Sequence, residues 1–264
     1  MKQLISLLTI LTIICINMPD LTAQTQQGDY LNVEYFMIEK SEIRHFESQV
    51  EPIVAKLQKA RIDASALKEW TLYRVAYPST QIPVYNYVAI SVCSAICSFE
   101  NIPEHIKSQF SEDELESLME SYRDIMIPVK AELWRINNRV VKSEESVPAR
   151  YFSMDYMNVA SGMEYVYQMM EDEIARPLHE QRMDNDRMEG WELYSLIVPS
   201  GTSYGYNFAT GNHFNRLRDI EFGFTDEMIR QNHPDTNINE FFENIERTRD
   251  PVRIEIWELL HHLN

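Results

Sequence analysis

Two stretches of this chain repeat each other and determine the fold that we expect. Residues 70–86 read WTLYRVAYPSTQIPVYN, and residues 191–207 read WELYSLIVPSGTSYGYN. The two tryptophans lie 121 positions apart (191 − 70), and the Leu-Tyr, Pro-Ser and Tyr-Asn pairs align at the same spacing. Because most of these residues are uncommon, their joint alignment indicates an internal duplication.

The repeat extends in both directions from this stretch. Upstream, Tyr30 aligns with Tyr151 and Tyr35 with Tyr156 at the same spacing. Downstream, residues 128–134 (PVKAELW) resemble residues 251–257 (PVRIEIW), with a shift of two positions in the spacing. We therefore expect a first α/β module at residues 28–145 and a second at residues 146–264.

Periodicity predicts the same element order in both modules. Residues rich in β-branched and aromatic side chains predict strands at 30–38, 70–77, 85–92 and 129–136, and in the second module at 151–159 and 252–260. Helical spacing predicts helices at 41–61, 111–127, 162–181, from 225 onward with a break at His233-Pro234, and at 238–249. Ser41 is the expected N-cap of the first helix, and Ser111 with Glu114 forms a capping-box pattern. The order β-α-β-β-α-β predicts a ferredoxin-like α+β module, in which helices cover one face of an antiparallel sheet.

This pattern resembles the dimeric α/β-barrel superfamily. The resemblance rests on the module order, the Trp-x-Leu-Tyr strand, the Pro-Ser loop and the Tyr-Asn-aromatic strand, and it covers both copies. It implies that the two modules pair through their open sheet faces into a barrel within one polypeptide. The superfamily includes cofactor-free monooxygenases, small-ligand binders and haem-dependent enzymes, so the fold does not identify the function.

The N-terminus and the composition predict an exported protein. Lys2, an apolar run at residues 4–16 and the small residue Ala23 are typical of a signal peptide over residues 1–23, which predicts a periplasmic or secreted protein. No later stretch is long and apolar enough to predict a membrane span. A formal net charge of −17 argues against nucleic acid as a partner. For Cys93 and Cys97 we expect two buried free thiols, with a local disulfide as the alternative.

Matched aromatic and amide side chains are the main candidates for ligand binding. They suggest an aromatic-lined pocket between each sheet and its helices, although such rings also pack cores. Strand alternation places Trp70 and Leu72 on one sheet face and Tyr73 on the other. Asn86 and Asn207 could orient a ligand or bond to the loops after Pro78 and Pro199. The candidate residues are Tyr35, Trp70, Tyr73, Arg74, Tyr85, Asn86, Tyr156, Trp191, Tyr194, Tyr206 and Asn207.

Charged residues give weaker signals. Arg74 could hold an anionic group or pair with a carboxylate such as Glu34. Glu34 and Asp155 are matched, and we interpret them as exposed charges that discourage edge pairing, with acid–base work as the alternative. His179 and His213 are the nearest candidates for a haem ligand, and we expect His261-His262 to lie in a disordered C-terminus. No metal ligands and no catalytic residues are predicted.

The sequence therefore predicts an exported protein that binds a small apolar or aromatic molecule in a pocket between sheet and helices. The alternative is a non-catalytic envelope or interaction protein whose pockets are filled by side chains. A cofactor-free, monooxygenase-like enzyme and a haem-dependent enzyme are further alternatives, and no cofactor is predicted.

Overall fold

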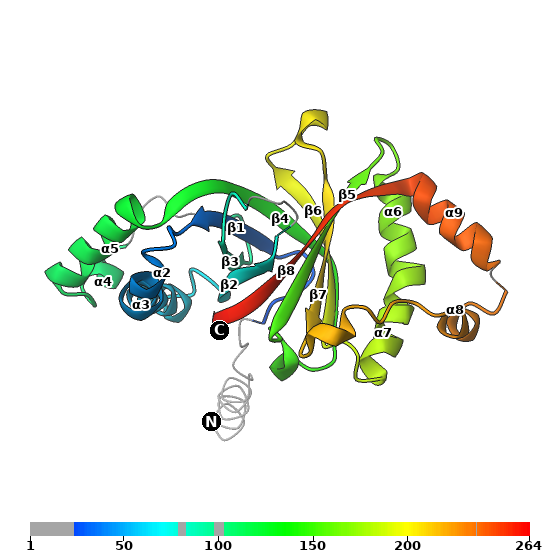
Figure 1. Cartoon of the computed structure of the whole chain (residues 1–264), viewed down its shortest axis with the longest axis horizontal. Helices are drawn as coiled ribbons and strands as arrows, with labels where there is room; N and C mark the ends of the chain where they lie inside the picture. Colours follow the sequence, from blue (N-terminus) through cyan, green and yellow to red (C-terminus); the bar gives the residue numbers. More distant parts are fainter. Residues whose placement is uncertain (1–23, 79–82, 98–102, 236) are drawn as a thin grey trace, which may run out of the picture.

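The computed structural model describes residues 24–78, 83–97, 103–235 and 237–264. Within these residues the chain passes twice through the order β-α-β-β-α-β, as predicted. Figure 1 shows a barrel of strands at the centre, with the helices of the N-terminal half on one side and those of the C-terminal half on the opposite side. The predicted signal peptide, residues 1–23, and Ser79 of the predicted Pro-Ser loop lie outside the described residues.

The described residues of the N-terminal half form four strands, with helical segments packed on one side of the barrel. Its elements are β1 (Tyr30–Met37), α2 (Ile43–His45), a π-helical turn (Phe46–Val50), α3 (Glu51–Asp63), β2 (Glu69–Tyr77), β3 (Tyr87–Cys93), α4 (Glu104–Lys107), α5 (Glu112–Asp124) and β4 (Ile127–Val141).

The C-terminal half repeats this arrangement. Its main elements are β5 (Tyr151–Val159), α6 (Glu164–Met170), a π-helical turn (Glu171–Ala175), α7 (Arg176–Asp184), β6 (Gly190–Val198), β7 (Phe208–Phe214), α8 (Asp226–Asn232), α9 (Ile238–Thr248) and β8 (Arg249–Leu263). Short 3-10 turns at Glu144–Ser146, Thr202–Tyr204 and Leu217–Asp219 connect these elements.

The strands close into a barrel in the order β1-β3-β2-β8-β5-β7-β6-β4. Each half contributes four antiparallel strands, and the halves join where β2 pairs with β8 and β4 pairs with β6. The last strand of each half is 15 residues long, because its first part pairs with its own half and its last part with the other half. The predicted strands 129–136 and 252–260 were therefore too short, since sequence periodicity does not show this second partner.

Strand alternation separates two cores. Trp70 and Leu72 on β2 pack against the helices of the N-terminal half, whereas Tyr73 points into the barrel lumen, as predicted. A matching core lies between sheet and helices in the C-terminal half and contains Trp191 and Leu193. The lumen is filled mainly by aromatic and aliphatic side chains from both halves.

Local capping signals define some of the helix starts. Ser111 and Glu114 form the predicted capping box at the start of α5. The hydroxyl of Thr225 accepts a hydrogen bond from the backbone N–H of Met228 at the start of α8. The prediction of Ser41 as an N-cap was wrong. The first helical segment begins at Ile43, and Glu42 at its N-cap makes no side-chain capping bond.

Three other expectations were wrong. Cys93 and Cys97 form a disulfide rather than two free thiols, with their Cα atoms 5.7 Å apart. His261 and His262 are not in a disordered tail, because they belong to β8 and pair with β2. Glu34 and Asp155 do not protect sheet edges, because β1 and β5 each have a neighbouring strand on both sides.

Candidate functional site

The structure divides the predicted binding residues between the two faces of the barrel wall. Six predicted tyrosines have their side chains in the core of the lumen: Tyr35, Tyr73, Tyr85, Tyr156, Tyr194 and Tyr206. Trp70 and Trp191 lie on the opposite face, under the helices of their own halves. One pocket therefore cannot contain all of these aromatic rings.

The tyrosines of the lumen surround a buried carboxylate, Glu132 on β4. Glu132 accepts hydrogen bonds from the Tyr35 hydroxyl at 2.7 Å, from Trp134 Nε1 at 3.1 Å and from Lys130 Nζ at 2.6 Å. The hydroxyls of Tyr204 and Tyr206 also donate to this carboxylate. Burial acts to raise the pKa of Glu132, but Lys130 and the hydrogen bonds from both tyrosines outweigh burial and hold the pKa below its usual range.

A related cluster surrounds Glu255 on β8. It accepts hydrogen bonds from the Tyr85 hydroxyl at 2.6 Å and from Trp257 Nε1 at 3.1 Å. The two clusters are in contact, because the ring centroids of Tyr35 and Tyr85 lie 4.8 Å apart. The Tyr35 hydroxyl also lies 2.9 Å from the Tyr156 hydroxyl. The sequence contained a signal for both carboxylates, because the repeated PVKAELW and PVRIEIW segments place a cation, a glutamate and a tryptophan at alternate positions of a strand.

The matched amides, Asn86 and Asn207, form hydrogen bonds with the backbone. The Asn86 side chain accepts a hydrogen bond from the Ile38 N–H at 2.8 Å and donates one to the Ile38 carbonyl at 2.9 Å. Asn207 makes the same two bonds with Val159, also at 2.8 and 2.9 Å. The amides therefore fix the ends of β1 and β5, rather than the loops after Pro78 and Pro199.

Arg74 lies outside these clusters. Its guanidinium is exposed and pairs with Glu258 at 3.0 Å and Glu47 at 3.6 Å, not with Glu34. The Arg74–Glu258 ion pair connects β2 of one half to β8 of the other, so Arg74 lies at the junction between the halves.

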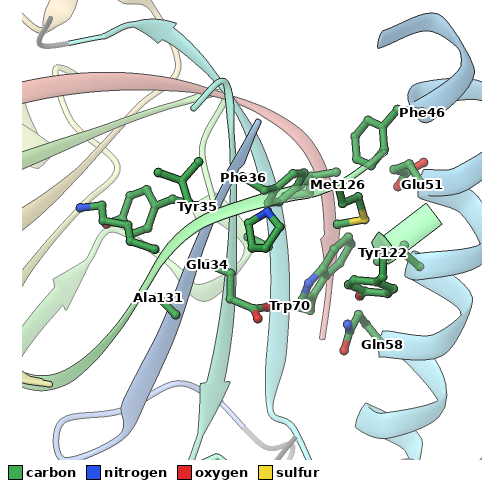
Figure 2. Close-up of a pocket in the computed structure, with 16 residues that line it drawn as sticks. Glu34, Tyr35, Phe36, Phe46, Glu51, Gln58, Trp70, Tyr122, Met126 and Ala131 are labelled. Atoms are coloured by element: carbon green, nitrogen blue, oxygen red, sulfur yellow. The ribbon is translucent and has the colours of Figure 1, made fainter. Parts of the chain in front are cut away.

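A cavity of about 280 Å³ lies between the sheet and the helices of the N-terminal half, and we call it the N-terminal cavity. Figure 2 shows Trp70, Tyr122, Gln58 and the carboxyl group of Glu34 around this space, with strands on one side and helices on the other. Its apolar walls include Phe36, Phe46, Trp70, Leu72 and Met126. A cavity lined mainly by apolar and aromatic groups with a few polar groups is typical of small-molecule sites.

Glu34 supplies a carboxylate to the N-terminal cavity. Solvent reaches its side chain, but the surrounding protein atoms raise the pKa of Glu34, and Arg61 on α3 opposes this increase only in part. A carboxyl group in this setting can accept a hydrogen bond from a ligand or, when protonated, donate one. Sequence matching identified the position of Glu34 but not its cavity, because the cavity forms only when α3 and α5 pack on the sheet.

A second cavity of about 260 Å³ lies at the corresponding place in the C-terminal half, and we call it the C-terminal cavity. Asp155 lines it at the position that matches Glu34. Burial raises the pKa of Asp155 to about 6, opposed by a hydrogen bond from Ser153 and by the nearby Arg182 and Arg249. The two halves therefore share the geometry of a cavity with a carboxylate on the first strand.

The histidines fit an axial haem ligand poorly. No histidine is among the residues that line the N-terminal cavity within the described chain. In the C-terminal cavity, the His179 ring stacks on Trp191 with ring centroids 5.1 Å apart. The Phe224 ring meets the same histidine edge-on, with ring centroids 4.9 Å apart. His213 lies in the lumen instead, with Nε2 3.4 Å from a Glu192 oxygen.

The described residues form neither a metal-binding cluster nor a membrane-spanning helix. No group of three or more His, Cys, Asp or Glu side chains is arranged to hold a metal ion. None of the described helices combines the length and apolar character needed to cross a membrane.

Comparison with known proteins supports the fold. No protein-family model and no curated protein matches the sequence. Among solved structures, a proposed monooxygenase from Fusobacterium nucleatum subsp. nucleatum has a TM-score of 0.51 at 7% identity, covering 91% of this chain and 96% of that chain. A chlorite dismutase variant from Candidatus Nitrospira defluvii has a TM-score of 0.49 at 10% identity, covering 91% and 94%. A haem-binding protein from Thermus thermophilus has a TM-score of 0.47 at 6% identity, covering 90% and 93%.

At 7% identity, the similarity to the Fusobacterium protein supports the arrangement of the chain and not its chemistry. The barrel, its element order and the similarity over nearly the whole chain agree with one another. In its fold this chain resembles the dimeric α/β-barrel superfamily, with two ferredoxin-like halves combined in one polypeptide.

Proposed function

We propose that this protein binds a small, largely apolar molecule in the N-terminal cavity, with Glu34 recognising a hydrogen-bond donor on that molecule. The observation that carries the proposal is the cavity of about 280 Å³, in which aromatic and aliphatic walls surround a carboxylate. The lumen offers a poorer site, because Glu132 and the tyrosines around it already satisfy one another.

We also propose that the protein acts outside the cytosol. The apolar run at residues 4–16 is typical of a signal peptide, and the Cys93–Cys97 disulfide is compatible with an oxidising compartment. Binding is proposed to occur without haem, because no histidine among the described residues lines the N-terminal cavity and the His179 ring is packed against Trp191 and Phe224. Haem added to the purified protein should then give no shifted Soret band, and a saturable Soret shift would contradict this part of the proposal.

Indole is a suitable probe for the N-terminal cavity, because it is aromatic and carries one N–H donor. Met126 lines this cavity and Met157 lines the C-terminal cavity, so their labelled methyl groups report separately on the two sites. Titration with indole should shift the Met126 methyl resonance and leave that of Met157 unchanged. Binding of 1-methylindole, which lacks the donor, should be weaker.

Two matched variants test the location. Ala89 lines the N-terminal cavity and Thr210 lines the C-terminal cavity at the matching position, 121 residues later. Ala89→Leu should fill the first cavity and abolish the Met126 shift, whereas Thr210→Leu should leave it intact. The proposal is wrong if indole causes no saturable Met126 shift or if Ala89→Leu binds indole as the parent protein does. Native mass spectrometry of protein from its own compartment then tests for a retained natural ligand.

A further inference from the structure

The two cavities occupy matching places but differ in chemistry. Met126 in the wall of the N-terminal cavity corresponds to Arg249 in the C-terminal cavity, at the spacing that also aligns the PVKAELW and PVRIEIW segments. Ala89 corresponds to Thr210. An apolar wall in one half is therefore replaced by donors and a positive charge in the other half.

Two arginines line the C-terminal cavity, and both have unused hydrogen-bonding capacity. Arg182 on α7 is only 6% exposed, and its Nε atom is buried with no hydrogen-bond partner among the described residues. The Nε atom of Arg249, at the start of β8, is also buried without a partner within the described part of the chain. Buried donors of this kind are rare because leaving a charged group unpaired is costly.

Two carboxyl groups share the C-terminal cavity with these arginines. Asp155 and Glu171 both line the cavity, and Arg249 acts electrostatically on each of them. Burial nevertheless raises the pKa of both carboxyl groups, so the electrostatic attraction of the arginines does not overcome their loss of hydration. The C-terminal cavity therefore combines open space with two partly unsatisfied guanidinium groups and the hydroxyl of Thr210.

Apolar groups line the rest of the cavity. Ile220, Phe224, Ile245 and Ile254 are among them, so an organic group could pack beside the arginines. Guanidinium groups bind carboxylates through paired, charge-assisted hydrogen bonds. We propose that the C-terminal cavity is a second binding site, specific for a small organic carboxylate that is held by Arg182 and Arg249.

This inference goes beyond the proposed function, because it concerns a different cavity and a different class of ligand. The charged residues that line this cavity suit a compact anion better than a haem group. Failure of the indole experiment would leave the carboxylate site standing, and the reverse is also true, because the two sites have separate methionine reporters.

Benzoate is the probe, and benzamide, its neutral analogue of similar shape, is the control. Benzoate should produce a saturable shift of the Met157 methyl resonance in the full chain and no shift of Met126. Arg249→Met places in this cavity the residue found in the other half, and it should weaken benzoate binding by about tenfold or more, as expected for the loss of a charge-assisted hydrogen bond. Arg249→Lys keeps the charge but loses the paired donors, and its affinity should be intermediate.

Three results would overturn the proposal: no saturable Met157 shift with benzoate, equal affinity for benzamide, or unchanged benzoate affinity in Arg249→Met. If Arg249→Met fails to fold, as judged by its methyl spectrum, the comparisons of benzoate with benzamide and of the parent with Arg249→Lys decide the question alone.

Discussion

Replacing Glu132 with glutamine should destabilise the barrel. The side chain of Glu132 is fully buried, and five donors surround its two oxygens. Glutamine keeps the shape but removes the charge, turns one acceptor into a donor, and leaves the Lys130 ammonium without its counter-ion at 2.6 Å.

The expected loss follows from the surroundings of Lys130. Removing one partner of a buried ion pair costs about 3 to 5 kcal/mol. The Lys130 side chain is 22% exposed, so water recovers part of its solvation and the lower end of this range applies. We therefore expect Glu132→Gln to lower the free energy of unfolding by about 3 kcal/mol.

Urea unfolding at neutral pH, followed by circular dichroism, measures this loss, and Glu255→Gln is the matched control. Glu255 also accepts a tyrosine and a tryptophan hydrogen bond, but its arginine neighbour, Arg253 Nε, is 3.7 Å from it rather than 2.6 Å. Its replacement should cost less, about 1 to 2 kcal/mol. A loss below about 1 kcal/mol for Glu132→Gln, or a larger loss for Glu255→Gln, would refute the reasoning.

The pH dependence gives a second check on the same variant. Because the pKa of Glu132 is lowered in the folded state, its contribution is present above the unfolded value of 4.5 and is lost as the pH falls through the folded value. The difference in stability between the parent and Glu132→Gln should therefore shrink as the pH falls below about 4.5. A difference that stays constant from neutral to acid pH would contradict the assignment of a charged Glu132.

Three further predictions concern other parts of the barrel. Asn86→Ala and Asn207→Ala should each lower the free energy of unfolding by about 1 to 3 kcal/mol, because each leaves a backbone N–H and carbonyl without a partner. Equal urea midpoints for the parent and the variants would contradict this prediction. The folded pKa of Asp155 is raised to about 6 from 3.8, so the protein should lose stability as the pH rises from about 4 through 6. Asp155→Asn should remove about 3 kcal/mol of that fall in a series of urea titrations. Gly211→Ala should lower the melting temperature, because a Cβ atom there would lie 2.6 Å from the Tyr194 hydroxyl; an unchanged melting temperature would show that the lumen can expand.

The sequence alone predicted the duplication, the element order and the two sheet faces. These features depend on patterns along the sequence, namely a fixed spacing between rare residues, alternation along β2 and capping signals such as Ser111 with Glu114. Each of these signals depends only on the order of the residues, so it can be recognised without the tertiary contacts.

The candidate site was only partly predictable. The sequence identified Trp70 and the matched tyrosines, but it did not show that Trp70 lines a cavity while the tyrosines surround Glu132 in the lumen. The matched glutamates were present in the aligned segments, yet their role depends on side chains from β1, β4 and the turn at Thr202–Tyr204 meeting in one place.

Tertiary structure alone decided the rest. Barrel closure gave β1 and β5 neighbours on both sides, lengthened β4 and β8, and ordered His261 and His262. The packing of helices on each sheet then placed Glu34 in the wall of one cavity and Asp155 with two arginines in the wall of the other. The physical reason is that burial, pKa and cavity shape depend on residues that are far apart in the sequence but in contact in the folded protein. Periodic patterns along the chain do not show which of these residues come into contact.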